Sequence, residues 1–157
     1  MSRAGSFDLE VATARLVAAT SAERLGLPVI GLAWATVDTD RAVGELTHAV
    51  PEAAPFEPGV PEALLGGSSL LGRATAGRVR LVILEPSTEW RLAAALARHD
   101  EGPVALWVGG NGRAFPADLR LSGPADGPFG RERLVLGAPI GGPHLLVVEE
   151  PAGTIDG

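Results

Sequence analysis

The order of helical and strand-like segments predicts one α+β domain built on a mixed, largely antiparallel sheet. The segments follow each other as helix, strand, helix, strands, helix, strand, irregular stretch and strands. This order lacks the regular alternation of strands and helices that marks a doubly wound parallel sheet. The chain has 157 residues, a normal size for a single domain. Its 21 glycines and 13 prolines indicate many turns and strand breaks.

The predicted fold starts with a helix over residues 8–25, which Asp8 can cap. Residues 28–38 form a continuous apolar run with β-branched side chains, typical of a buried strand. A second helix follows, capped within residues 38–40 and ended by Pro51. The apolar stripe of the first helix consists of Leu9, Ala12, Leu16 and Ala19.

The chain continues with an irregular stretch, because residues 51–67 hold four prolines. The segments SSLLGRATAG and RVRLVILEP then read as two strands paired around Gly77. Ser87 or Thr88 is expected to cap an alanine-rich helix that ends near His99. The segments PVALWVGG, RERLVLG and HLLVVEE are the remaining predicted strands.

Composition excludes several classes of function. The sequence contains no cysteine, lysine or tyrosine, which excludes thiolate chemistry, a Schiff-base lysine and a phenolic acid. A net charge of −6, with arginines scattered singly, argues against a nucleic-acid partner. No apolar run is long enough to span a membrane, and the first residues lack a secretory signal. We therefore expect a cytoplasmic protein with neither a membrane nor a nucleic-acid partner.

Short motifs that would carry catalysis or a cofactor are not convincing in this sequence. GGSSLLG lacks the spacing of a nucleophile elbow, and GGNGRAF lacks the third glycine and the lysine of a phosphate loop. The three histidines show no metal-ligand spacing. The carboxylates Glu85, Glu89, Asp100 and Glu101 flank a helix and are expected to be solvated caps. We therefore expect no cofactor.

Residues 82–108 resemble the junction between the two halves of vicinal oxygen chelate proteins, the superfamily of glyoxalase I, bleomycin-resistance proteins and methylmalonyl-CoA epimerase. The motif LEP (84–86) stands where the family has a strand-ending turn, and HDEG (99–102) stands before the next strand. WATVDTDRA (34–42) is similar to the first strand and helix of the family, and RERLVLGAPIGGPHLLVVEE (131–150) to its closing hairpin.

The resemblance implies paired βαβββ modules that form one curved mixed sheet around a cleft. The modules would span about 28–86 and 103–150, joined by helix 87–99. Residues 1–27 would be an extra N-terminal helical extension, and 151–157 a tail. The second module has room only for a vestigial helix around NGRAFPADL. The apolar stripe of the N-terminal helix would then need a cover, so we expect a possible homodimer.

Catalytic members of this superfamily bind a divalent metal with one side chain from each of four strands. The corresponding positions in this chain are Gly31, Val82, Ala105 and Leu146, with Val148 as the alternative on the last strand. None of these side chains offers an oxygen or imidazole donor. The resemblance therefore implies a divergent member without the metal ligands.

Strand alternation places further residues on the predicted cleft face. Trp107 offers a stacking surface, although simple core packing would explain it equally well. Arg80 and His144 are the polar candidates to orient a ligand, although a solvated strand position and a surface position are the alternatives. The full predicted ligand-binding set is Gly31, Ala33, Ala35, Arg80, Val82, Leu84, Ala105, Trp107, His144 and Leu146.

Two hypotheses of function follow. The first is a metal-independent glyoxalase-fold protein that binds a hydrophobic or aromatic small metabolite in the cleft, as in sequestration or drug resistance. The second is a metal-independent isomerase or cyclase of a secondary metabolite, for which His144 is the candidate acid/base. A third possibility is a partner subunit with a degenerate cleft.

Overall fold

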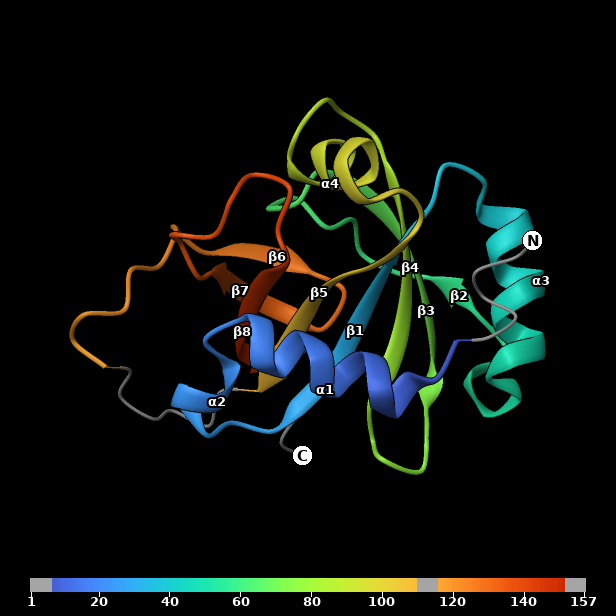
Figure 1. The fold of residues 1–157 in the computed structure, drawn as a ribbon, viewed down its shortest axis with the longest axis horizontal. Coiled ribbons are helices and arrows are strands. Elements are labelled where there is room, and N and C mark those ends of the chain that lie inside the picture. The colour runs from blue at the N-terminus through green and yellow to red at the C-terminus, as the bar shows by residue number, and fades with distance from the viewer. Residues whose placement is uncertain (1–6, 110–115, 152–157) are drawn as a thin grey trace.

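The computed structural model describes residues 7–109 and 116–151, and these residues form one curved eight-stranded mixed sheet with helices (Figure 1). The strand order is β2-β3-β4-β1-β5-β8-β7-β6. The α+β class and the curved sheet are therefore confirmed. The strands are β1 (Val29–Ala35), β2 (Glu57–Pro58), β3 (Gly67–Ala74), β4 (Arg80–Pro86), β5 (Gly102–Gly109), β6 (Ala125–Gly127), β7 (Gly130–Leu134) and β8 (His144–Pro151).

The sheet consists of two similar halves that meet at its centre. In the first half β1 lies parallel to β4, and in the second half β5 lies parallel to β8. The antiparallel pair β1 and β5 joins the halves, with Ala33 opposite Ala105 and Gly31 opposite Trp107. This arrangement agrees with the predicted pairing of modules, and it brings the first strand of each module to the centre of the sheet.

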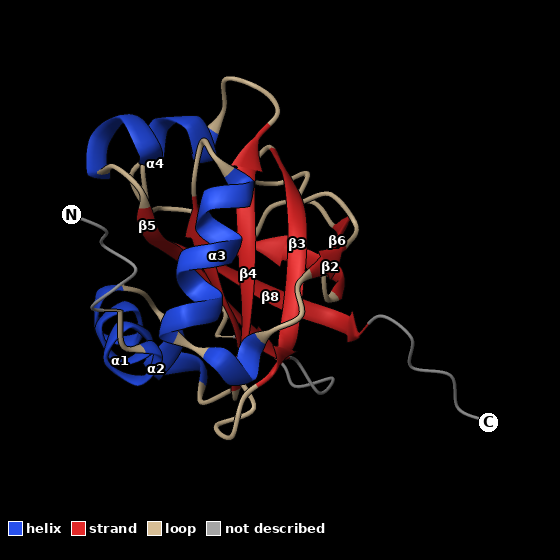
Figure 2. Cartoon of the chain, turned by 90° about the vertical axis from the view of Figure 1, so that its right-hand side faces the viewer, coloured by secondary structure: helices blue, strands red, loops and turns tan. Residues whose placement is uncertain are grey.

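Helix α3 (Thr39–Ala49) and the N-terminal helices α1 (Leu9–Ala19) and α2 (Ala22–Leu25) cover one face of the sheet (Figure 2). Helix α3 contacts β4 of the first half, and α1 contacts β5 of the second half. Ala12 and Leu16 of α1 are buried in the same cluster as Leu106 and Val147. The centre of the predicted stripe is thus covered within the chain, whereas Ala19 is exposed, and the homodimer stays a prediction.

The predicted helix over residues 8–25 is in fact two helices. Asp8 caps α1 as expected, because its carboxylate accepts a hydrogen bond from the backbone N–H of Val11. The hydroxyl of Thr20 then donates to the carbonyl of Leu16 and accepts from the N–H of Ala22. This side chain takes over backbone bonding at the helix end and separates α1 from α2. The predicted vestigial helix of the second module falls largely on residues 110–115, outside the described residues.

Helix α4 (Arg91–His99) begins later than the sequence suggests and has no side-chain cap. Ser87 and Thr88 lie before the helix in a bonded turn, in which the N–H of Ser87 donates to the carbonyl of Gly66 and the carbonyl of Thr88 accepts from the N–H of Trp90. The indole of Trp90 also donates to the carbonyl of Leu64. These bonds hold residues 87–90 against the loop before β3, and the helix starts only after them.

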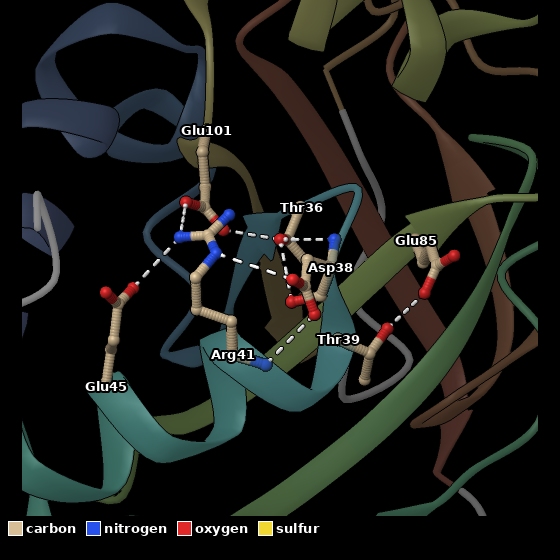
Figure 3. A network of polar contacts seen from close by, with 7 residues as sticks. All are labelled: Thr36, Asp38, Thr39, Arg41, Glu45, Glu85 and Glu101. Carbon is tan, nitrogen blue, oxygen red and sulfur yellow. Dashed lines mark hydrogen bonds and ion pairs between the residues drawn. The ribbon is translucent and has the colours of Figure 1, made fainter.

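A polar network at the junction of the modules connects α3 to the segment before β5 (Figure 3). The Arg41 guanidinium lies 2.8 Å from a carboxylate oxygen of Glu101 and 3.2 Å from one of Glu45. Glu101 also accepts from the hydroxyl of Thr36, and Glu85 accepts from the hydroxyl of Thr39. Glu85 and Glu101 are therefore bonded side chains and not the solvated caps that were predicted.

Among the described residues, no helix has the length and apolar character needed to cross a membrane.

Candidate functional site

The predicted cleft residues lie together on the sheet face opposite α1 and α3, which we call the inner face. Residues of this face alternate along each strand with those of the helix-covered face. Trp34 packs on the helix-covered face, as the predicted strand orientation requires. The buried cluster of the inner face includes Ala33, Ala35, Val82, Leu84, Ala105, Trp107, Leu146 and Val148.

The inner face is closed in this structure by the ring of Phe129, which lies in the turn between β6 and β7. A Cβ atom added to Gly31 would lie 2.5 Å from Cε2 of Phe129 and 3.0 Å from Cε3 of Trp107. The Phe129 ring therefore occupies the space above Gly31 that the first metal ligand would require. Val82, Ala105 and Leu146 are 0% exposed, so the face is a packed surface and not an open cleft.

Two buried carboxyl groups that the sequence analysis did not select meet beside Trp107. Glu132 on β7 accepts a hydrogen bond of 2.9 Å from the indole Nε1 of Trp107. Glu62, in the loop before β3, accepts bonds of 3.0 and 3.3 Å from the backbone N–H groups of Leu64 and Leu65. Both glutamates are 0% exposed. We call Glu62 and Glu132 the carboxyl pair.

The carboxyl pair must share at least one proton. Each carboxyl interacts with the other, and the oxygens without another partner are Oε1 of Glu62 and Oε2 of Glu132. Two ionised oxygens would repel each other, whereas a proton on one makes it a donor. Burial, followed by the interaction with Glu62, raises the pKa of Glu132 to about 10. Burial also raises the pKa of Glu62, but the N–H donors favour its charged form. The shared proton therefore belongs to Glu132.

His144 is buried at the start of β8 and not on the surface, which contradicts the surface alternative. Its Nε2 lies 2.9 Å from the carbonyl oxygen of Ile140. A carbonyl only accepts, so Nε2 carries the hydrogen and Nδ1 is left as a buried acceptor without a partner among the described residues. Burial is the main cause that lowers the pKa of His144, so the ring is neutral at pH 7.

Arg80 is the first residue of β4 and pairs with Gly31 of β1 in the sheet register. Its Nε donates a hydrogen bond of 2.8 Å to the carbonyl of Gly72 on β3. Part of its guanidinium is therefore engaged with the neighbouring strand, and Arg80 is a half-buried structural residue in this structure.

The residues at the four positions predicted from the resemblance offer no ligand to a divalent metal. Gly31, Val82, Ala105 and Leu146 provide no donor atom, although they lie close together on neighbouring strands. Over residues 7–109 and 116–151, no group of three or more His, Asp or Glu side chains could hold a metal ion. No chemistry is therefore assigned to a metal at this site.

A groove of about 490 Å³ lies on the other side of the sheet, between α1 and the turn that leads into β5. Its lining includes Val11, Trp34 and Pro103. Two of its carboxylates already have structural partners, since Asp8 caps α1 and Glu101 binds Arg41. Trp34 also leaves its indole Nε1 without a partner among the described residues, whereas the two facing carboxyl oxygens without another partner lie on the inner face.

Comparison with known proteins identifies the fold as that of vicinal oxygen chelate proteins. No protein-family model and no curated protein sequence matches the chain. Methylmalonyl-CoA epimerase from Mycobacterium tuberculosis superposes with a TM-score of 0.61 at 18% identity, covering 80% of this chain and 88% of the epimerase. A Streptomyces coelicolor methylmalonyl-CoA epimerase variant in complex with 2-nitronate-propionyl-CoA gives 0.58 at 20% identity, covering 80% and 98%.

A hypothetical protein from Bacillus halodurans gives a TM-score of 0.58 at 13% identity, with 83% of this chain and 99% of the other covered. At these identities the likeness establishes the fold alone. The predicted resemblance is therefore confirmed as a shared fold.

The sequence analysis missed Phe129, Glu62 and Glu132. Glu132 lies between Arg131 and Arg133 in the strand RERLVLG, so strand alternation turns its side chain to the other face of the sheet from theirs. That signal could have marked Glu132 as inward-facing. Glu62 lies in the proline-rich stretch, where no periodic pattern indicates which side chains are buried.

Proposed function

We propose that this protein is a metal-independent, cytoplasmic binding protein that holds a small hydrophobic or aromatic molecule on the inner face. The observation that carries the proposal is the chemistry of the four family ligand positions, which are all apolar and surround Trp107. Apolar walls with few convergent polar groups are typical of small-molecule sites. In this proposal the ring of a ligand takes the place of the Phe129 ring above Gly31.

Truncation of Phe129 tests this proposal directly. Phe129→Ala should open a ring-sized space beside Trp107, because the phenyl group is the part of Phe129 that contacts Gly31 and Trp107. Indole and 2-phenylethanol should then bind the variant more tightly than the wild type. Phe56→Ala is the matched control, because Phe56 packs against the opposite face.

Binding is measured by quenching of tryptophan fluorescence and by the rise in melting temperature with probe concentration. A gain of binding in Phe129→Ala but not in Phe56→Ala is the expected result. If Phe129→Ala folds and binds neither probe at millimolar concentration, the proposed site is wrong. Elemental analysis of the wild type should find no stoichiometric metal, and one metal per chain would contradict metal independence.

The second candidate function is a metal-independent isomerase or cyclase of a secondary metabolite. Proton-carrying groups on the inner face favour it: neutral His144 has a free Nδ1 acceptor, and Glu132 holds a proton at neutral pH. Incubation with a bound metabolite in D₂O separates the two functions. An isomerase releases product or deuterated substrate, whereas a binding protein returns the molecule unchanged.

A further inference from the structure

The hydrogen bonds of the carboxyl pair leave a place for one proton between its facing oxygens, so the pair keeps one buried negative charge, and no described residue supplies a compensating cation. The groups that act on its pKa values are the two carboxyls themselves, the backbone N–H groups of Leu64 and Leu65, and the indole of Trp107. None of the ion pairs formed by the described residues includes Glu62 or Glu132. Buried charges in proteins are normally paired, so this arrangement is unusual.

The charged and titratable groups on the neighbouring strands are turned to other partners. Arg131 is exposed on β7, and Arg133 binds Glu149 at 3.0 Å and the carbonyl of Ser122. His144 on β8 is neutral because burial lowers its pKa. The charge of the carboxyl pair is therefore available to a cation that comes from outside the chain.

We infer that the inner face accepts a small lipophilic ammonium ion, an amine on an apolar or aromatic body, whose N–H groups donate to the facing oxygens of Glu62 and Glu132. An ammonium group has several donors and no acceptor, which matches two facing oxygens that have no partner among the described residues besides the shared proton. The ammonium would replace the shared proton and leave both carboxyls ionised. This inference rests on the proposed binding site and specifies its ligand class.

The surroundings of the carboxyl pair suit the rest of such a ligand. The rings of Trp107 and Phe129 lie 5.1 Å apart, centroid to centroid, next to Glu132. Aromatic faces attract cations, and the effect is greatest where water is excluded. Aliphatic side chains such as Leu134 and Leu146 complete the wall. A small anion would meet the negative charge of the carboxyl pair, so the site should reject it.

The two carboxyls come from different modules, which gives the amine a way to fit between them. Glu132 is fixed in the ladder between β7 and β8, opposite Val148. Glu62 lies outside the named strands, in a loop that backbone bonds of Gly59 and Glu62 and the hydroxyl of Ser69 join to β3. The inference requires this loop to shift from Glu132, so that a nitrogen atom can lie between the two oxygens.

Calorimetric titration of 2-phenylethylamine and its neutral isostere 2-phenylethanol tests the inference. The wild type should bind the amine at least tenfold more tightly than the alcohol at pH 8. About one proton should be released per amine bound, which is counted by titrating in two buffers of different ionisation enthalpy. The dissociation constant of the amine should therefore fall about tenfold from pH 7 to pH 8, and that of the alcohol should stay constant.

Glu132→Gln should abolish the preference for the amine, since its amide donates where the shared proton was and leaves no proton to release. Glu149→Gln, which alters a carboxylate bound to Arg133 outside the carboxyl pair, should preserve the preference. Equal binding of amine and alcohol, or amine binding without proton release, would overturn the inference while leaving the binding site intact. If neither probe binds the wild type or Phe129→Ala, the proposed function and this inference both fail.

Discussion

The shared proton of the carboxyl pair should make the free energy of unfolding depend on pH in a way that one substitution removes. Glu132→Gln is nearly isosteric with the protonated side chain. Its carbonyl oxygen can accept from the Trp107 indole, and its amide can donate to Oε1 of Glu62. The variant therefore keeps the native hydrogen bonds but no longer titrates at this position.

The sign and size of the effect follow from the raised pKa of Glu132, which is about 10 against a reference of 4.5. The folded protein retains the proton between these values, whereas the unfolded chain releases it. Stability is thus fully present below the unfolded pKa and is lost as pH rises towards the folded pKa. One proton corresponds to about 1.4 kcal/mol per pH unit, so the wild type should lose about 3 kcal/mol from pH 7 to pH 9.

Urea unfolding at pH 7, 8 and 9 measures this loss in the wild type and in Glu132→Gln. The range avoids His144, whose lowered pKa affects stability only below its reference value of 6.5. The variant should lose about 3 kcal/mol less than the wild type over this range. Glu62→Gln is the comparison, because it leaves the charge on Glu132, which has the Trp107 indole as donor, and not on Glu62, which has two backbone N–H donors. Glu62→Gln should be less stable than Glu132→Gln at pH 7. If the free energy of unfolding falls equally with pH in the wild type and in Glu132→Gln, the reasoning is refuted.

Three further changes test the fold around the site. Gly31→Ala should destabilise the protein by about 1–3 kcal/mol, because the new methyl group overlaps Phe129. Gly44→Ala should stabilise helix α3 by about 0.5–1 kcal/mol, since nothing lies within 4 Å of its added Cβ. Urea unfolding compares the two variants, and an unchanged stability of Gly31→Ala would contradict the packing around Phe129. Deletion of residues 1–27 should expose the apolar side chains of β5 on the helix-covered face, and so lower the melting temperature or cause aggregation seen by light scattering. An unchanged melting temperature would contradict the role of α1. Chelators should leave the melting temperature of the wild type unchanged, and a decrease would reveal a metal.

The strand pattern of the sheet was predictable because strand alternation is a local property. Apolar runs located β1, β4, β5 and β8, and two-residue periodicity correctly separated Trp34 from Trp107. The short strand β6 was missed, because three residues are too few to show a period. The predicted N-cap Asp38 of α3 was also correct, since its carboxylate accepts from the backbone N–H of Arg41.

The state of the inner face could not be predicted, because it depends on contacts between segments far apart in the chain. Residue alternation identifies which side chains share a face but not what covers them. Phe129 reaches Gly31 across almost one hundred positions of sequence, and Glu62 meets Glu132 across 70 positions. The role of α1 was missed for the same reason, since its partner β5 is equally distant.

The contacts of the inner face connect Gly31, one of the four predicted ligand positions, to the carboxyl pair. Gly31 must lack a side chain because Phe129 lies on it, and Phe129 is held in place by the ring of Trp107. The indole of Trp107 is fixed in turn by Glu132, whose carboxyl needs the proton shared with Glu62. A donor side chain introduced at Gly31 would displace the first of these contacts and disturb the rest. The inner face and its carboxyl pair therefore form one packed unit, in which two aromatic rings pack at the centre and a shared proton links the two carboxyls beside them.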